Sequence, residues 1–328
     1  MADLSTRYMG LQLRSPFLVA SSSLSNKIEN FQSAEASGAG AIVLRSLFEE
    51  QIEAAESELE EAISFQADAN PEARSYMPPQ RIGPREYLRL IERAKKTVQI
   101  PIIASLNCAA PGSWSEYARQ LQDAGADALE VNIYSVGADP DVSGEQLERE
   151  YVEIVAGVRE AITVPMALKV SPFFTSFANA ARKFDDAGVN ALVLFNRFLQ
   201  PDIDLDRMAL HSSMQLSHPW EMLLPLRWTA ILYGRVQCDL AASTGVHDVA
   251  GAVKMLLAGS TVVQLAATLL RNGVNHLAAL RGGLEDWMER GRYSALDDFR
   301  GTLSQKEARD PRAFERAQYV NLILSQNN

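Results

Sequence analysis

Polar side chains gather where the predicted buried strands end, and their types suit work on a small molecule. The run LEVNIYSVGADP, residues 129–140, starts as an apolar strand and then presents an amide, a phenol and the Ser135 hydroxyl before a turn. One strand-end asparagine is more often a turn former than a ligand. Asparagines at three strand ends, Asn107, Asn132 and Asn196, reverse that preference and indicate an enzyme site.

Lys169 is the sharpest single signal, because it lies inside the apolar run VPMALKV. An unpaired ammonium in a buried strand is costly, so this lysine needs a partner. The partner can be a carboxylate, a Schiff-base substrate or the anionic edge of a cofactor. The structural alternative is an ion pair, for example with Glu130.

Two further strand ends indicate a phosphate site. Ser-Thr-Gly at 243–245 and Ala-Ala-Thr at 266–268 combine hydroxyls with small residues. Small residues let the backbone approach an anion, and barrels often bind phosphate after their last two strands. Small residues are also common where helices start.

The elements that carry these groups repeat along the chain. Residues 36–44, 123–131, 186–194 and 257–265 each read as a helix end, a glycine, a short link and an apolar strand. We expect strands at 16–20, 41–46, 101–107, 128–134, 165–170, 191–196, 236–242 and 261–266. We expect helices near 28–37, 85–97, 114–124, 144–161, 175–187, 219–231, 247–258 and 272–290.

Eight alternating strand and helix units predict a single (β/α)8 barrel domain over residues 1–328. A doubly wound open sheet is the alternative, but no GxGxxG motif follows the first strand. Residues 47–84 form a long insertion after the second strand, and 197–218 form an excursion after the sixth. We expect an acidic helix at 49–66. Its charged face is either exposed to solvent or docks a partner protein. A helical tail is expected from about residue 296.

Composition excludes several classes of function. The chain of 328 residues carries 31 Lys and Arg against 41 Asp and Glu, a formal net charge of −10. Such a surface repels nucleic acid and anionic lipid. Cys108 and Cys238 lie far apart without a CxxC motif, which argues against iron–sulfur or structural metal sites. No signal peptide or membrane span is evident, so we expect a cytoplasmic protein, and a homodimer is compatible with the sequence.

The order of these motifs resembles the dihydroorotate dehydrogenase family of FMN-dependent (β/α)8 barrels. The resemblance rests on YMGLQLRSPFLVASSS, EVNIYS, ALKVSPFF, LVLFNR, a Thr-Gly loop and LLAGSTVVQLAATLL, and it covers roughly residues 5–300. It implies an oxidoreductase that removes a proton from a small carbonyl compound while hydride passes to FMN. Electrons would leave to a soluble acceptor or a redox partner protein.

The resemblance also implies roles for single residues. FMN would be bound by Ala20, Ser21, Asn107, Asn132, Lys169, Ser243, Thr244, Gly245, Ala267 and Thr268. The substrate would be bound by Arg45, Asn132, Asn196 and Arg197. Ser135 lies where the family places its general base, and Lys169 would be catalytic by stabilising the reduced flavin ring.

The chain departs from the family on the substrate side. Val136-Gly137 replaces the family's Pro-Asn, Arg45 replaces a lysine, and Arg197 stands where serine usually follows the strand-six asparagine. The flavin half of the site therefore matches better than the substrate half. The leading hypothesis is oxidation of a CH–CH bond of dihydroorotate or a related compound. The alternatives are a flavin-free lyase or isomerase with a Schiff base on Lys169, or a flavin-binding subunit without catalysis.

Overall fold

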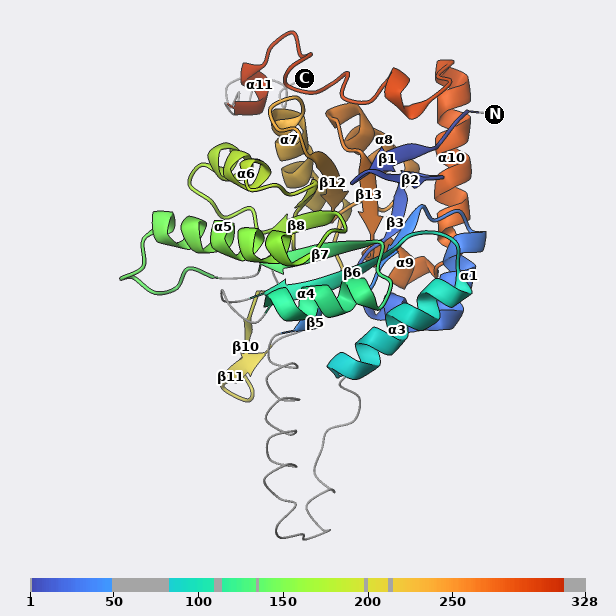
Figure 1. The fold of residues 1–328 in the computed structure, drawn as a ribbon. Coiled ribbons are helices and arrows are strands. Elements are labelled where there is room, and N and C mark those ends of the chain that lie inside the picture. The colour runs from blue at the N-terminus through green and yellow to red at the C-terminus, as the bar shows by residue number, and fades with distance from the viewer. Residues whose placement is uncertain are drawn as a thin grey trace.

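Parallel strands form a closed barrel at the centre of the molecule (Figure 1). This computed structural model describes residues 2–48, 83–108, 114–133, 136–197, 200–211 and 215–315. The barrel strands are β3 (Phe17–Val19), β4 (Ala41–Val43), β6 (Ile102–Cys108), β7 (Ala128–Ile133), β8 (Met166–Val170), β9 (Ala191–Leu194), β12 (Asp239–Ser243) and β13 (Val262–Leu265). Pairing of β4 with β6 closes the ring. Closure confirms the (β/α)8 barrel and excludes the open sheet.

Helices alternate with the strands and cover the outside of the barrel (Figure 1). They are α1 (Ile28–Ala36), α3 (Pro84–Thr97), α4 (Trp114–Asp123), α5 (Gly144–Ala161), α6 (Phe177–Asp186), α7 (Leu223–Leu232), α8 (Val249–Ala258) and α10 (His276–Gly291). The helix-ending glycines behave as expected; Gly259, at φ 114°, ends α8 in the left-handed conformation. A short helix, α9 (Ala267–Asn272), also follows β13.

One strand begins several residues later than predicted, whereas the other barrel strands begin within one residue of the prediction. Strand β12 starts at Asp239, whereas the sequence pattern placed its start at residue 236. The backbone N–H groups of Gln237 and Cys238 donate to the Asp185 carboxylate at 2.7 and 2.9 Å, so they do not join the strand ladder. A side-chain acceptor from a distant helix therefore shortens this strand.

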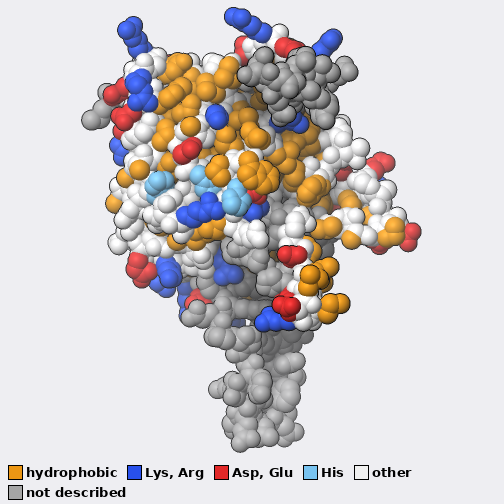
Figure 2. Space-filling model, turned by 180° about the vertical axis from the view of Figure 1, so that it is seen from behind, with side chains coloured by type: hydrophobic (Ala, Val, Ile, Leu, Met, Phe, Trp, Pro, Cys, Tyr) orange, Lys and Arg blue, Asp and Glu red, His pale blue; other side chains and the backbone are white. Residues whose placement is uncertain are grey.

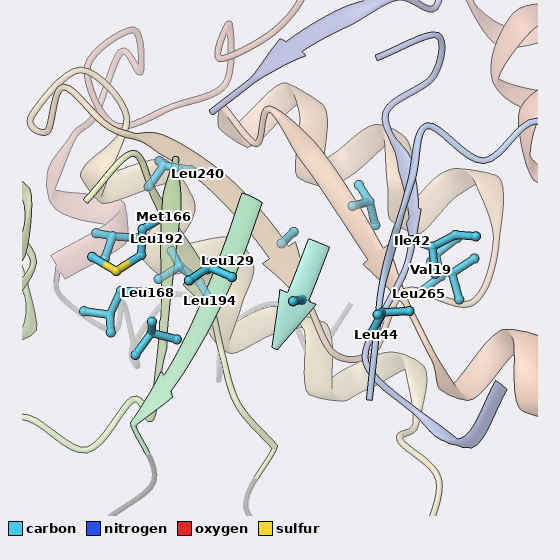
Figure 3. Packing of buried hydrophobic residues seen from close by; sticks show 14 of the residues in the cluster. Val19, Ile42, Leu44, Leu129, Met166, Leu168, Leu192, Leu194, Leu240 and Leu265 are labelled. Atoms are coloured by element: carbon cyan, nitrogen blue, oxygen red, sulfur yellow. The ribbon is translucent and has the colours of Figure 1, made fainter. Parts of the chain in front are cut away.

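Two apolar layers flank the barrel wall, because every strand is buried on both faces. Outward side chains pack against the helices, and Figure 3 shows Leu168 of β8 beside Leu192 of β9, which are register partners. Near the amino ends of the strands, the side chains that face the barrel interior are small. They include four alanines from neighbouring strands, namely Ala128, Ala167, Ala191 and Ala241.

The inner level nearer the carboxyl ends of the strands is polar. Side chains alternate along a strand, so the residues two positions after three of these alanines also face inward; they are Glu130, Lys169 and Ser243. Each is less than 9% exposed. A hairpin of β1 (Thr6–Tyr8) and β2 (Leu11–Leu13) lies at the opposite end, where buried Tyr8 and Met9 join the inner apolar cluster.

Two segments depart from the barrel repeat. The excursion after β9 contains an exposed hairpin of β10 (Asp202–Asp204) and β11 (Ala209–His211), which projects from the carboxyl-end side of the barrel (Figure 1). The 3-10 helix η4 (Pro219–Met222) then leads into α7. The acidic helix expected at 49–66 lies outside the described residues.

The segment after α10 contains η5 (Leu296–Asp298) and α11 (Arg312–Glu315) joined by turns. The remainder of the expected helical tail lies outside the described residues. Among the helices of the described part, none is long and apolar enough to cross a membrane.

Candidate functional site

A cavity of about 240 Å³ opens at the carboxyl ends of the barrel strands. It brings together many of the residues that sequence analysis assigned to the site, although they come from distant parts of the chain. Those residues are Ala20, Ser21, Lys169, Asn196, Arg197, Ser243, Thr244, Gly245 and Ala267. The cavity is therefore built where a barrel enzyme has its active site.

The loop after β12 is held in a tight left-handed turn. Thr244 and Gly245 have φ angles of 79° and 78°, a conformation that glycine adopts readily and threonine rarely. A Cβ atom on Gly245 would lie 2.3 Å from the backbone nitrogen of Met222. Only glycine permits this approach, so the loop, which lines the cavity, packs directly against η4.

A buried polar cluster lies in the wall of the cavity. The Lys169 ammonium lies 3.4 Å from Glu130 Oε1, and Gln264 Nε2 donates to Glu130 Oε2 at 2.6 Å. Lys169 and Gln264 both line the cavity. The ion pair that sequence analysis weighed as the structural alternative is present, and the ammonium nevertheless stays at the cavity.

The two strand asparagines lie beside Lys169. Asn107 of β6 pairs in register with Asn132 of β7, which pairs in turn with Lys169 of β8. Asn132 is 6% exposed, and its Oδ1 has no hydrogen-bond partner among the described residues. Neither asparagine lines the cavity in this conformation. An unpartnered buried acceptor beside the cavity favours a ligand N–H as its missing partner.

A chain of serine hydroxyls supports the part of the wall that contains Ser21. Ser21 Oγ accepts from the Ser46 backbone N–H at 3.0 Å, and Ser46 Oγ lies 2.8 Å from Ser105 Oγ. The Ser105 N–H donates to the Tyr87 hydroxyl at 3.0 Å. The chain links the ends of β3 and β4 to β6, so it fixes the position of the Ser21 hydroxyl in the cavity.

Arg197 has a structural partner that the sequence did not reveal. Its Nε donates to Glu221 Oε1 at 2.9 Å, and its NH1 donates to the Gln215 carbonyl. Burial acts to raise the pKa of Glu221, but the His218 N–H and Arg197 outweigh it and hold that pKa below its usual value. Arg197 thus ties the excursion to the end of β9 and still lines the cavity.

Two further predicted site residues, Arg45 and Thr268, do not line the cavity. Arg45 is exposed and does not line the cavity. The Thr268 hydroxyl is buried and donates to the His247 carbonyl at 3.1 Å, so it braces the two loops. Ser135, the expected general base, lies outside the described residues.

Comparison with known proteins agrees with this geometry. A dihydroorotate dehydrogenase B (NAD(+)) catalytic subunit of Thermoplasma acidophilum is 25% identical over 318 residues, which is 92% of this chain and 99% of that protein. The protein of the same name from Methanothermobacter thermautotrophicus is 26% identical over 231 residues, 66% of this chain and 72% of that protein. No protein-family model matches the chain.

The chain resembles the dihydroorotate dehydrogenases. A third relative of the same printed name, from Pelobacter propionicus, is 28% identical over 221 residues, 63% of this chain and 69% of that protein. The alignment with the Thermoplasma acidophilum protein matters most, because it spans 92% of this chain.

Sequence reasoning missed Gln264. Gln264 lies within the apolar run VVQLAA of β13 and is 2% exposed. A polar side chain inside a buried strand is the same signal that identified Lys169, so the pattern could have revealed it. Gln215, Leu216 and Ser217 were also missed, because their place in the wall depends on how the excursion folds back.

Proposed function

We propose that this protein is an FMN-dependent oxidoreductase that oxidises a CH–CH bond of dihydroorotate or a related small compound. The observation that carries the proposal is the position of Lys169, a buried cation in the wall of a cavity at the carboxyl end of the barrel. A positive charge there would stabilise the anionic form of a reduced flavin ring. FMN would supply hydride acceptance, which no protein side chain supplies.

The described residues fit the ring of FMN. Its pyrimidine edge offers acceptors together with one N–H donor. Lys169 provides a donor, while Gln264 Oε1 and Asn132 Oδ1 are buried acceptors without partners among the described residues. A ligand edge with both kinds of group would satisfy all three. Ala20 and Ser21 of the β3 end would contact the ring from the adjacent wall.

The phosphate of FMN would lie at the loops after β12 and β13. Ser243, Thr244, Gly245 and Ala267 line that side of the cavity, where small side chains let the backbone approach an anion. Thr268 would act indirectly, because its hydroxyl already bonds to the His247 carbonyl. Burial, followed by the nearby Arg271, lowers the pKa of His247, so this histidine is neutral at pH 7.

Substrate would bind above the ring near Asn132, Asn196 and Arg197. Ser135 would remove the substrate proton, directly or through a water, and Arg45 would have to approach from its exposed position. Serine is a weak base and needs a neighbour that accepts its proton. The residues that depart from the family pattern on the substrate side argue for a substrate related to dihydroorotate as much as for dihydroorotate itself.

Electrons would pass to a small acceptor or a redox partner protein, and we propose that the chain also forms a homodimer. Ile203 and Leu210 are register partners on one face of the β10–β11 hairpin and are 62% and 79% exposed. An isolated two-stranded hairpin is marginally stable alone. Apolar side chains also gather on the face shown in Figure 2. A second copy of this chain would cover the hairpin face, since identical subunits are the commonest partners.

The Schiff-base alternative is less well supported. A Schiff base needs a lysine nitrogen that is free to attack a carbonyl, whereas the Lys169 nitrogen is held 3.4 Å from Glu130 Oε1. A flavin-binding subunit without catalysis remains a distinct alternative, which reduction by substrate would exclude.

The test is anaerobic reduction of the bound flavin. The purified chain is loaded with FMN and mixed with a panel of dihydropyrimidines, and bleaching of the flavin absorbance is followed. Bleaching by one compound, slowed at least about a hundredfold in Ser135→Ala, would support the proposal. A chain that takes up no FMN would refute it, and full-rate bleaching in Ser135→Ala would refute the assignment of the base.

A further inference from the structure

Glu130 connects the two buried side chains that face the proposed flavin edge. Glu130 is 1% exposed, and Gln264 reaches it from β13, 134 residues away in sequence. The contact crosses the barrel interior, because β8, β9 and β12 separate β7 from β13 in the sheet. The cluster is therefore held by the closed barrel and not by local sequence.

Hydrogen-bond chemistry fixes the orientation of Gln264. An ionised carboxylate only accepts hydrogen bonds, so the amide nitrogen of Gln264 must face Glu130. Its Oε1 is left as a buried acceptor with no partner among the described residues. Glu130 thereby decides which end of the amide is free to meet a ligand at the cavity wall.

The charge of Glu130 is balanced by Lys169. Among the described side chains with a shifted pKa, Tyr8 and Tyr87 are influenced by Glu130. Burial, reinforced by Glu130, raises the pKa of both phenols above the usual range, although the Ser105 N–H opposes the shift at Tyr87. Both phenols are neutral at pH 7. Within the described residues, the cluster is then one anion paired with one cation.

We propose that Glu130 and Gln264 are positioning residues that hold the Lys169 ammonium at the cavity wall and moderate its field at the flavin edge. The inference rests on the proposed function, because the flavin is the group that would sense this field. A neighbouring carboxylate weakens the potential that the ammonium exerts on a reduced flavin. Loss of that carboxylate would favour the reduced, anionic ring.

The first experiment measures the reduction potential of bound FMN against reference dyes in wild type and Glu130→Gln. We expect the variant to bind reduced over oxidised flavin about tenfold more favourably than wild type does, a shift of about +30 mV for a two-electron couple. Asp239→Asn is the matched control, since it removes a partly buried carboxylate at the opposite end of the barrel. That control should leave the potential unchanged.

Gln264→Met tests the second positioning residue with little change in volume. It keeps the Glu130 charge but removes both the donor to Glu130 and the unpartnered acceptor. We expect affinity for oxidised FMN to fall about fivefold, the usual effect of one hydrogen bond, with a smaller change in potential than in Glu130→Gln. An affinity equal to wild type would overturn the role of Gln264.

The second experiment does not depend on flavin. The full chain without added FMN is pulsed with acetic anhydride at pH 8, and acetylation of Lys169 is quantified by peptide mass spectrometry. Attack on the anhydride requires the Lys169 nitrogen to leave its contact with Glu130 Oε1, which Glu130→Gln weakens. We expect Lys169 to react at least about threefold faster in Glu130→Gln, and no faster in Asp239→Asn.

The two measurements separate the possible failures. If Glu130→Gln changes neither the potential nor the labelling, while Lys169→Met shifts the potential, the positioning role is overturned and the flavin site stands. If wild type binds no FMN but labelling still rises, the flavin proposal fails and the control of Lys169 by Glu130 stands. If FMN is not bound and labelling is unchanged, both are wrong.

Discussion

Arg197 and Glu221 form an ion pair of 2.9 Å that joins the end of strand β9 to the 3-10 helix η4. The pair spans the segment in which the chain leaves the barrel repeat, and Arg197 also binds the Gln215 carbonyl. The wall formed by residues 215–217 therefore depends on this contact as well as on the barrel itself.

Glu221→Gln should loosen that wall without unfolding the protein. The pair is partly exposed, so the free energy of unfolding should fall by less than about 1 kcal/mol. Hydrogen exchange at residues 215–218 should become faster, and FMN affinity should weaken. Glu148→Gln, which removes the exposed pair with Lys183 on α5 and α6, is the matched control and should change neither quantity. Unchanged exchange in Glu221→Gln would contradict the role of the pair.

Lys169→Met should destabilise the fold as well as the reduced flavin. It leaves Glu130 as an uncompensated buried charge, which costs about 3–5 kcal/mol. The double variant Lys169→Met/Glu130→Gln should recover most of that loss in urea unfolding, because no isolated charge remains. Recovery of flavin reduction in the double variant would show that the ammonium is not needed at the flavin.

Gly245→Ala should prevent the β12 loop from packing against η4. The added methyl group would meet the Met222 backbone at 2.3 Å, and φ at this position is positive. We expect a loss of at least about 2 kcal/mol in unfolding free energy and of FMN binding. Gly144→Ala at the start of α5, where no atom lies within 4 Å, should be nearly neutral. Equal effects of the two variants would show that the close approach is not required.

Protonation of His247 should destabilise the protein below about pH 6.5. Burial, with Arg271 nearby, lowers the folded-state pKa, so the unfolded chain binds the proton more readily between the two pKa values. The stability due to the neutral ring is present above the unfolded pKa and is lost as pH falls through the folded pKa. Urea unfolding at pH 7.5 and 5.5 should show a smaller drop in His247→Gln than in wild type. An identical drop would assign the pH dependence to other groups.

Leu210→Asp should convert the proposed homodimer into a monomer. The substitution places a charge on the exposed apolar face that Leu210 shares with Ile203. Sedimentation velocity measures the change directly. Leu303→Asp, at a comparably exposed leucine in the segment after α10, should leave the assembly intact. A wild-type chain that sediments as a monomer would refute the homodimer.

The alternating pattern of apolar strands and glycine-ended helices was enough to determine the barrel. Continuously apolar strands such as 191–194 must be covered on both faces, and eight strand–helix units close in only a few ways. The pattern also placed Lys169 and Ser243 at strand ends, because the end of a strand is a local property.

Contacts between distant segments were decided by tertiary structure alone. The bond from Gln264 to Glu130 crosses the barrel interior, and the pair of Arg197 with Glu221 depends on how an irregular excursion returns to the rim. Such contacts follow from strand register and closure, which sum many weak interactions over the whole chain. Local sequence therefore determined which polar groups lie at the strand ends, while the closed barrel and the returning excursion decided which groups line the cavity and which are paired.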